Sequence, residues 1–169
     1  MYTETVIDNK EHCMQVMLGM EEAFRSKNED YFINVLKEER SLVLRVHAVC
    51  ILADIGSEKS VEPLADVLLN DPDPLVRHEA AFSLGQIGSS KAVGYLHKAV
   101  LEDKDPIVRH EAAAALGSIG SVDSEDVLKK ALNDSEEIVR NSARASLFNI
   151  EFLKEYFPGT SAHERAPRP

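Results

Sequence analysis

The chain has 169 residues, of which 44% are hydrophobic and 28% are charged, and its net charge is −10 at pH 7. This length and composition are typical of one globular domain, and the acidic balance argues against a nucleic acid partner, because phosphate binding needs a basic surface. Aromatic residues make up only 6% and tryptophan is absent, which favours a core of packed helices built from aliphatic side chains.

The sequence shows no targeting or membrane segment. Its first residues lack a basic start followed by an apolar run, so no signal peptide is expected. No apolar run approaches the ~20 residues that a membrane helix needs. The two cysteines, Cys13 and Cys50, do not form a disulfide framework and are expected to be small buried hydrophobic residues. We therefore expect a reduced, cytoplasmic protein.

Residues 1–40 are expected to form an N-terminal helical extension or cap. Apolar residues at helical spacing predict a first helix over residues 11–26. A second helix is predicted to begin after Asn28, with an apolar side made by Tyr31, Phe32, Val35 and Leu36. A stacked array of helices needs such a capping element at its end.

Residues 41–157 contain four copies of one pattern, anchored by arginines that are spaced 32, 32 and 31 residues apart. The anchors are Arg45, Arg77, Arg109 and Arg140. A fixed period in this range is typical of stacked helix pairs, and one pair cannot bury its apolar face alone. The sequence therefore predicts an all-α fold, a right-handed α-solenoid of about four helix pairs.

The ends of the first helix in each copy carry local signals. Asp73-Pro74 and Asp105-Pro106 place a capping carboxylate before a proline at the first helical position. Ser41 and Ser135 are the corresponding candidates in the outer copies. Glycines that follow the first helices are expected to end them in the left-handed conformation; these are Gly56, Gly88 and Gly120. From Phe157 onward the pattern stops, and residues 158–169 are expected to be a disordered tail. A His-Glu dipeptide at 163–164 lies in this tail and lacks the surrounding helix pattern.

Two copies carry a His-Glu pair directly after the anchor arginine, His78-Glu79 and His110-Glu111. On a helical wheel, His78 lies at about 200° from Val76, opposite the predicted core stripe. That stripe consists of Val76, Ala80, Leu84 and Ile87. A solvated face should be polar, yet the neighbours of His78 on this face are Ala81, Phe82 and Gly85.

Two explanations of this apolar face stay open. It can meet a partner or substrate, as exposed apolar surfaces usually do. Alternatively, first helices of adjacent copies touch each other there and widen the apolar stripe.

The functional interpretation of the two His-Glu pairs is a metal site. Imidazoles and carboxylates without a thiolate suit iron or manganese better than structural zinc. Adjacent first helices lie ~10 Å apart, so His78, Glu79, His110 and Glu111 can converge on one region. Helical bundles build two-iron centres from about twice this number of ligands. A two-fold dimer with the two faces opposed would supply the remainder.

Resemblance to known families rests on two motifs, VRHEAAFSLGQIG and VRHEAAAALGSIG. They resemble HEAT-like repeats of the phycobilisome-lyase type, and more closely those of deoxyhypusine hydroxylase. That family has two four-repeat halves, each with His-Glu in its two middle repeats only. Here too the outer copies lack the pair and have Val46-His47 and Asn141-Ser142 instead. The resemblance covers about residues 41–150 and implies four HEAT-like helix pairs.

The resemblance also implies a function. In that family the two halves face each other and hold a two-iron centre, which activates dioxygen to hydroxylate an amine-bearing side chain of a translation factor. It implies that His78, Glu79, His110 and Glu111 are iron-site residues of a di-iron monooxygenase or hydroxylase. Because this chain has half the family's length, the centre would be shared between two chains of a homodimer, with a protein or cationic amine as substrate.

A metal-free HEAT-repeat scaffold for protein–protein binding is the alternative, since solenoids often present a curved surface to a partner and fold does not decide function. In that case the His-Glu pairs are inherited with the repeat and the apolar face docks another chain. A third interpretation is the handling of a phycobilin chromophore, which would not need His-Glu pairs in register. The sequence contains no nucleophile motif, phosphate loop or dinucleotide fingerprint.

Overall fold

The computed structural model of the chain describes residues 2–157, with side chains from residue 10 onward. Within these residues the chain forms nine α-helices and two short 3-10 turns, without a strand. The predicted all-α fold is confirmed.

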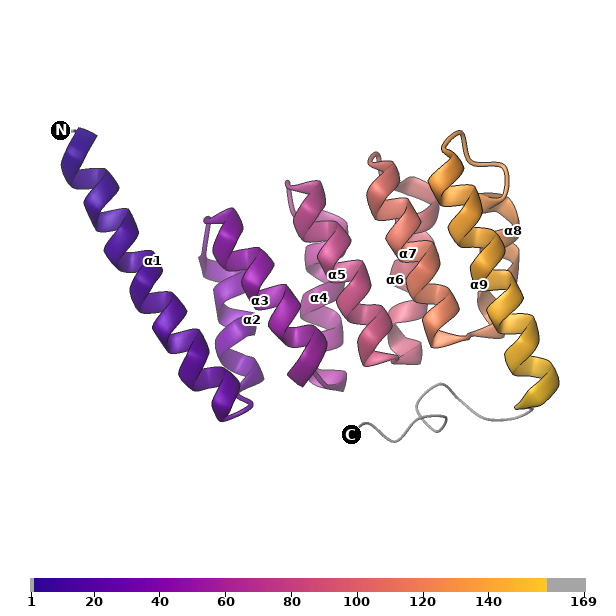
Figure 1. The fold of residues 1–169 in the computed structure, drawn as a ribbon, viewed down its shortest axis with the longest axis horizontal. Helices are drawn as coiled ribbons and strands as arrows, with labels where there is room; N and C mark the ends of the chain where they lie inside the picture. Colours follow the sequence, from indigo (N-terminus) through magenta and orange to yellow (C-terminus); the bar gives the residue numbers. More distant parts are fainter. Residues whose placement is uncertain (1, 158–169) are drawn as a thin grey trace.

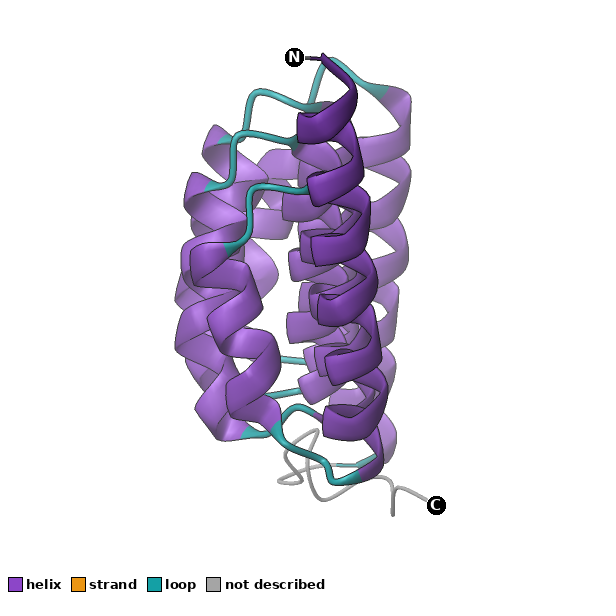
Figure 2. Cartoon of the chain, turned by 90° about the vertical axis from the view of Figure 1, so that its left-hand side faces the viewer, coloured by secondary structure: helices purple, strands orange, loops and turns teal. Residues whose placement is uncertain are grey.

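The helices form the two layers of an α-solenoid (Figure 1). One layer consists of α1 (Tyr2–Arg25), α3 (Leu42–Ile55), α5 (Pro74–Ile87), α7 (Pro106–Ile119) and α9 (Glu137–Tyr156). The other consists of α2 (Glu29–Glu38), α4 (Glu58–Asn70), α6 (Val93–Glu102) and α8 (Glu125–Ala131). The 3-10 turns Ser90–Ala92 and Val122–Ser124 lead into α6 and α8. Figure 2 shows the two layers from the N-terminal end of the stack.

Helices α1 and α2 form the first pair of the stack, while α9 stands at the other end without a second helix among the described residues. Helix α1 begins at Tyr2, well before the predicted start at residue 11. The hydroxyl of Tyr31 on α2 donates to the Val16 carbonyl of α1 at 3.0 Å. The predicted tail, including the dipeptide at 163–164, lies outside the described residues.

The aspartate caps form as predicted. Asp73 accepts a hydrogen bond from the backbone N–H of Leu75, and Asp105 accepts one from Ile107, both at 2.9 Å. Ser41 occupies the cap position of α3, but its side chain makes no capping bond. The prediction for Ser135 was wrong. Helix α9 begins one residue later, after Glu136, and the Ser135 hydroxyl instead contacts the carboxylates of Asp134 and Glu136.

Two of the three glycines end their helices in the left-handed conformation. Gly88 has a φ of 72° and Gly120 a φ of 68°. The prediction was wrong for Gly56, whose φ is −65°. A Cβ at Gly56 would lie 2.2 Å from the Leu52 carbonyl oxygen and 3.1 Å from the Ile87 side chain. Close packing, and not backbone handedness, requires glycine at this position.

The predicted core stripe of α5 is fully buried. The second apolar face around each histidine is also largely buried, because it forms the contact between neighbouring helices of one layer. A Cβ at Gly85 of α5 would lie 2.9 Å from the Ala115 Cβ of α7, and a Cβ at Gly117 would lie 2.4 Å from the Ser146 hydroxyl of α9. At these positions contact between first helices is therefore the correct one of the two explanations. Phe82 remains 40% exposed.

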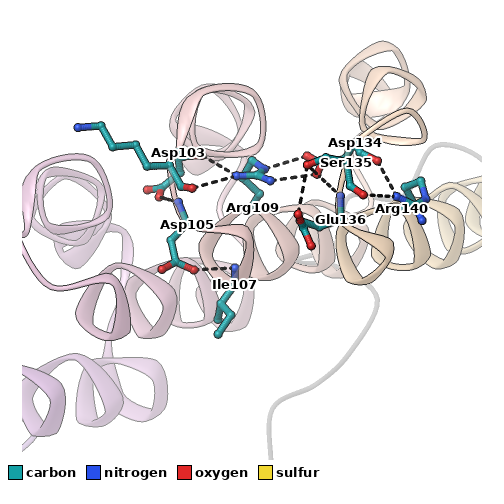
Figure 3. Close-up of polar contacts among 9 residues, drawn as sticks. Asp103, Asp105, Ile107, Arg109, Asp134, Ser135, Glu136 and Arg140 are labelled. Atoms are coloured by element: carbon teal, nitrogen blue, oxygen red, sulfur yellow. Dashed lines mark hydrogen bonds and ion pairs between the residues drawn. The ribbon is translucent and has the colours of Figure 1, made fainter.

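A ladder of arginine–aspartate pairs joins successive repeats. The Nε atom of each of the first three anchor arginines lies 2.8 Å from an aspartate oxygen in the loop after the following second helix, in the pairs Arg45–Asp71, Arg77–Asp103 and Arg109–Asp134. The next anchor arginine donates to the backbone carbonyl of the same aspartate, so the hydrogen bonds of the ladder are continuous from repeat to repeat. Figure 3 shows the C-terminal half of this ladder. It ends at Arg140, which donates to the carbonyls of Asp134 and Ser135 but has no carboxylate partner among the described residues.

None of the helices within residues 2–157 combines the length and the apolarity that crossing a bilayer would require.

Candidate functional site

The four predicted site residues lie in one row across α5 and α7. His78 Nε2 lies 3.3 Å from Glu111 Oε2, and His78 Nδ1 lies 3.2 Å from Glu79 Oε1. His110 Nε2 lies 3.9 Å from the same Glu111 oxygen. The order is therefore Glu79, His78, Glu111, His110, and we call these four residues the His–Glu row. Equal register on two adjacent helices brings them together, as the sequence predicts.

Two further residues extend the row. Neither of them was predicted from the sequence as a neighbour of the His-Glu pairs. The Ser142 hydroxyl of α9 lies 2.5 Å from His110 Nδ1, and the Cys50 thiol of α3 lies 3.5 Å from Glu79 Oε2. Register could have identified Ser142, because it stands two residues after Arg140, where Glu79 and Glu111 stand relative to their own arginines.

The prediction that Cys50 is buried was wrong, because Cys50 is exposed, while Cys13 is half-buried. Cys50 lines an apolar groove of about 480 Å³ between α1 and α3, together with Met17 and Phe24 of α1. The groove between α1 and α3 is open, and Cys50 stays exposed in it.

The row is partly desolvated but keeps some access to solvent. Its four side chains are between 15% and 28% exposed. The hydrogen bond to Glu111 raises the pKa of His78 above its ordinary value. Although Cys50 is exposed, partial desolvation of its thiol and the nearby Glu79 carboxylate raise the pKa of the thiol to about 11. Cys50 is therefore a neutral thiol near pH 7.

The donor types of the row fit iron or manganese, which bind imidazole nitrogen and carboxylate oxygen. The number of donors fits only part of a site. Among the described residues, no group of three or more histidine, cysteine or acidic side chains is arranged to hold a metal ion.

Comparison with protein families finds a match to HEAT repeats over residues 29–96 and 61–147. Together these ranges cover more than half of the chain, and the chain belongs to the HEAT-repeat family. No curated protein matches the sequence.

Two solved structures confirm the resemblances that the repeat motifs predict. Human deoxyhypusine hydroxylase in complex with glycerol is 30% identical with a TM-score of 0.67, over 75% of this chain and 44% of the hydroxylase. The complex of CpcE and CpcF of phycocyanin lyase from Nostoc sp. PCC7120 is 26% identical with a TM-score of 0.63, over 80% of this chain and 57% of that one. An engineered protein is 27% identical with a TM-score of 0.55, over 73% of this chain and 62% of that one. This chain therefore spans less than two thirds of each.

Proposed function

We propose that this chain carries half of a non-haem di-iron centre, that a second copy supplies the other half, and that the centre serves dioxygen activation or hydroxylation. The His–Glu row is the observation that carries the proposal. It places two imidazoles and two carboxylates in succession on the two central helices, each 3.2–3.9 Å from the next. The likeness to deoxyhypusine hydroxylase supports the same chemistry.

Each row residue has a role in this proposal. His78 and His110 would ligate metal through a ring nitrogen, and Glu79 and Glu111 would ligate or bridge. Ser142 lies against His110 Nδ1, so it would orient the imidazole with Nε2 toward Glu111, as outer partners of metal-binding histidines do. When bound, iron would supply the binding and reduction of dioxygen.

The need for a second copy follows from the ligand count. One chain supplies four donors, and two-iron centres in helical proteins use about twice as many. The row side chains remain 15–28% exposed, so a second chain can reach them. The net charge of −10 favours a cationic substrate, such as an amine or a basic protein segment.

The test is the metal content of the purified protein, measured for wild type and for His78→Ala and His110→Ala. We expect about one iron per chain in the wild type, as for a two-iron centre shared by two chains, and loss of most of it in both variants. His47→Ala is the matched control, because His47 is an exposed histidine of α3 outside the row. Equal iron in all four proteins would refute the proposal.

One observation favours the alternative, a metal-free scaffold for protein binding. Apolar side chains remain exposed on the row helices, including Phe82 at 40% and Ile107 at 52%. A protein that binds neither Fe²⁺ nor Mn²⁺ in equilibrium dialysis would favour this function.

A further inference from the structure

The outer face of α9 differs from the corresponding faces of α5 and α7. On those helices Gly85 and Gly117 stand eight residues after the anchor arginine and let the next helix approach closely. On α9 the same register holds Phe148, whose side chain is 71% exposed. A further repeat therefore could not stack on α9 as α9 stacks on α7, because even one Cβ at Gly117 would overlap Ser146.

This outer face carries an apolar stripe. Ala145, Phe148 and Phe152 follow at intervals of three and four residues, the spacing of a helix–helix seam. Phe152 is 42% exposed, and its ring stacks on Tyr156, which is 59% exposed, with centroids 4.6 Å apart. A terminal repeat that only caps a solenoid needs a polar outer face. An exposed aromatic stripe instead indicates a contact surface.

Two charges of opposite sign flank the stripe on one side. Arg144 and Glu151 are seven residues apart, which places them two turns apart on the same flank, ~10 Å along the axis. The Arg144 guanidinium donates to the Asn141 side chain at 2.8 Å. Neither Arg144 nor Glu151 forms an ion pair with another residue in the described part of the chain.

The arrangement of charge and apolar residues is self-complementary. When two copies of one helix pair antiparallel about a two-fold axis, residues of the same flank face each other. With the axis near Phe148, Arg144 of each copy meets Glu151 of the other, and Ala145 lies opposite Phe152. A small residue thus faces a large one, and both charges find partners.

We infer that the outer face of α9 is the docking surface for a second copy of this chain, paired antiparallel through Ala145, Phe148 and Phe152 with reciprocal Arg144–Glu151 ion pairs. This interface is separate from the one that the proposed function requires, because α9 stands between the two-fold axis and the row on α5 and α7. The inference does not rest on the proposed function, and both contacts can exist in one assembly.

The experiment measures mass in solution by sedimentation equilibrium on metal-free protein over a concentration series. Wild type is expected to be a dimer and Phe148→Ser a monomer. Arg144→Glu and Glu151→Arg should each raise the dissociation constant at least about tenfold, which corresponds to ~1.4 kcal/mol, and the double variant should restore it. Leu101→Ser is the control and should remain dimeric, because Leu101 at the end of α6 is 47% exposed but distant from the stripe.

Three results would overturn the inference: a monomeric metal-free wild type, a dimeric Phe148→Ser, or a double variant no better than the single ones. Circular dichroism on every variant separates loss of pairing from loss of fold. The two proposals fail separately. If the protein dimerises only with Fe²⁺, and His78→Ala abolishes this dimerisation, the result would contradict the α9 interface and support the shared centre. If Phe148→Ser is monomeric but keeps a normal iron content, the result would support the α9 interface and contradict the sharing of the centre.

Discussion

The two central repeats and the two outer ones share one scaffold but differ at a few positions. All four keep the anchor arginine that binds the backbone of the preceding loop. Only α5 and α7 carry a His-Glu pair after it and a glycine eight residues after it. At the histidine register, α3 has Val46 and α9 has Asn141, and at the glycine register they have Ala53 and Phe148.

This difference separates the residues that hold the repeats together from the residues that only the central repeats carry. Helix α3 packs on α5, and α9 packs on α7, although neither outer helix has a His-Glu pair. Stacking therefore does not need the row, whereas the arginine–aspartate ladder runs through every junction between the anchors. We expect ladder changes to lower stability and row changes to affect metal binding.

The largest expected effect is in the middle of the ladder. In the Arg77–Asp103 pair the side chains are only 14% and 8% exposed, so Arg77→Gln leaves a buried carboxylate without its partner and should lower the free energy of unfolding by ~3 kcal/mol. Arg140→Gln should lower it by less than ~1 kcal/mol, because Arg140 has no carboxylate partner in residues 10–157. Urea unfolding of both variants measures the contrast, and equal losses would contradict it.

A smaller effect is expected at the central glycines. Gly117→Ala places a Cβ 2.8 Å from the Ser146 Cα, so the backbones of α7 and α9 must separate, at a cost of ~2 kcal/mol. Gly94→Ala in α6 is the control, because a Cβ there meets nothing within 4 Å. It should leave stability unchanged or raise it by up to ~1 kcal/mol. Thermal unfolding compares the two, and an equal response would show that the close approach of α7 and α9 is not required.

The pH dependence of stability should also reflect the ladder. The hydrogen bond from Arg109 lowers the pKa of Asp134 below its ordinary 3.8. The ionised carboxylate therefore stabilises the fold above pH ~4, and this contribution is lost as the pH falls through the lowered folded-state pKa. Asp134→Asn should be less stable than wild type at pH 7 by about 1–2 kcal/mol, and the difference should shrink toward pH 2. A constant difference across this range would contradict the assignment.

The smallest effect on stability is expected in the row. Glu111→Gln removes the carboxylate beside both histidines, but these side chains keep access to solvent. The free energy of unfolding of the metal-free protein should change by no more than ~1 kcal/mol. A loss as large as that of Arg77→Gln would mean that the row, like the ladder, holds the stack together.

Much of the fold is predictable from sequence because its signals are local and repeated. The arginine period, the Asp-Pro caps and the buried stripe of α5 each follow from spacing alone. The row is predictable for the same reason, since equal register on adjacent helices brings His78 beside Glu111.

Other features depend on how helices sit against each other. A glycine after a helix can serve a left-handed turn or a close contact, and Gly56 serves the second. The exposure of Cys50 depends on the course of α1, which sequence periodicity does not specify. The polar start of α1 carries no apolar periodicity, so its extent from Tyr2 was missed.

The most direct test of the row as half of an iron centre is an anaerobic titration of the metal-free protein with Fe²⁺, with bound iron and the unfolding midpoint measured on the same samples. We predict about one iron bound per chain and a rise in stability, because a ligand that binds only the folded state stabilises it. Glu111→Gln should lose both responses while the metal-free protein stays folded. Absence of binding in the wild type, or binding that persists in Glu111→Gln, would contradict the account.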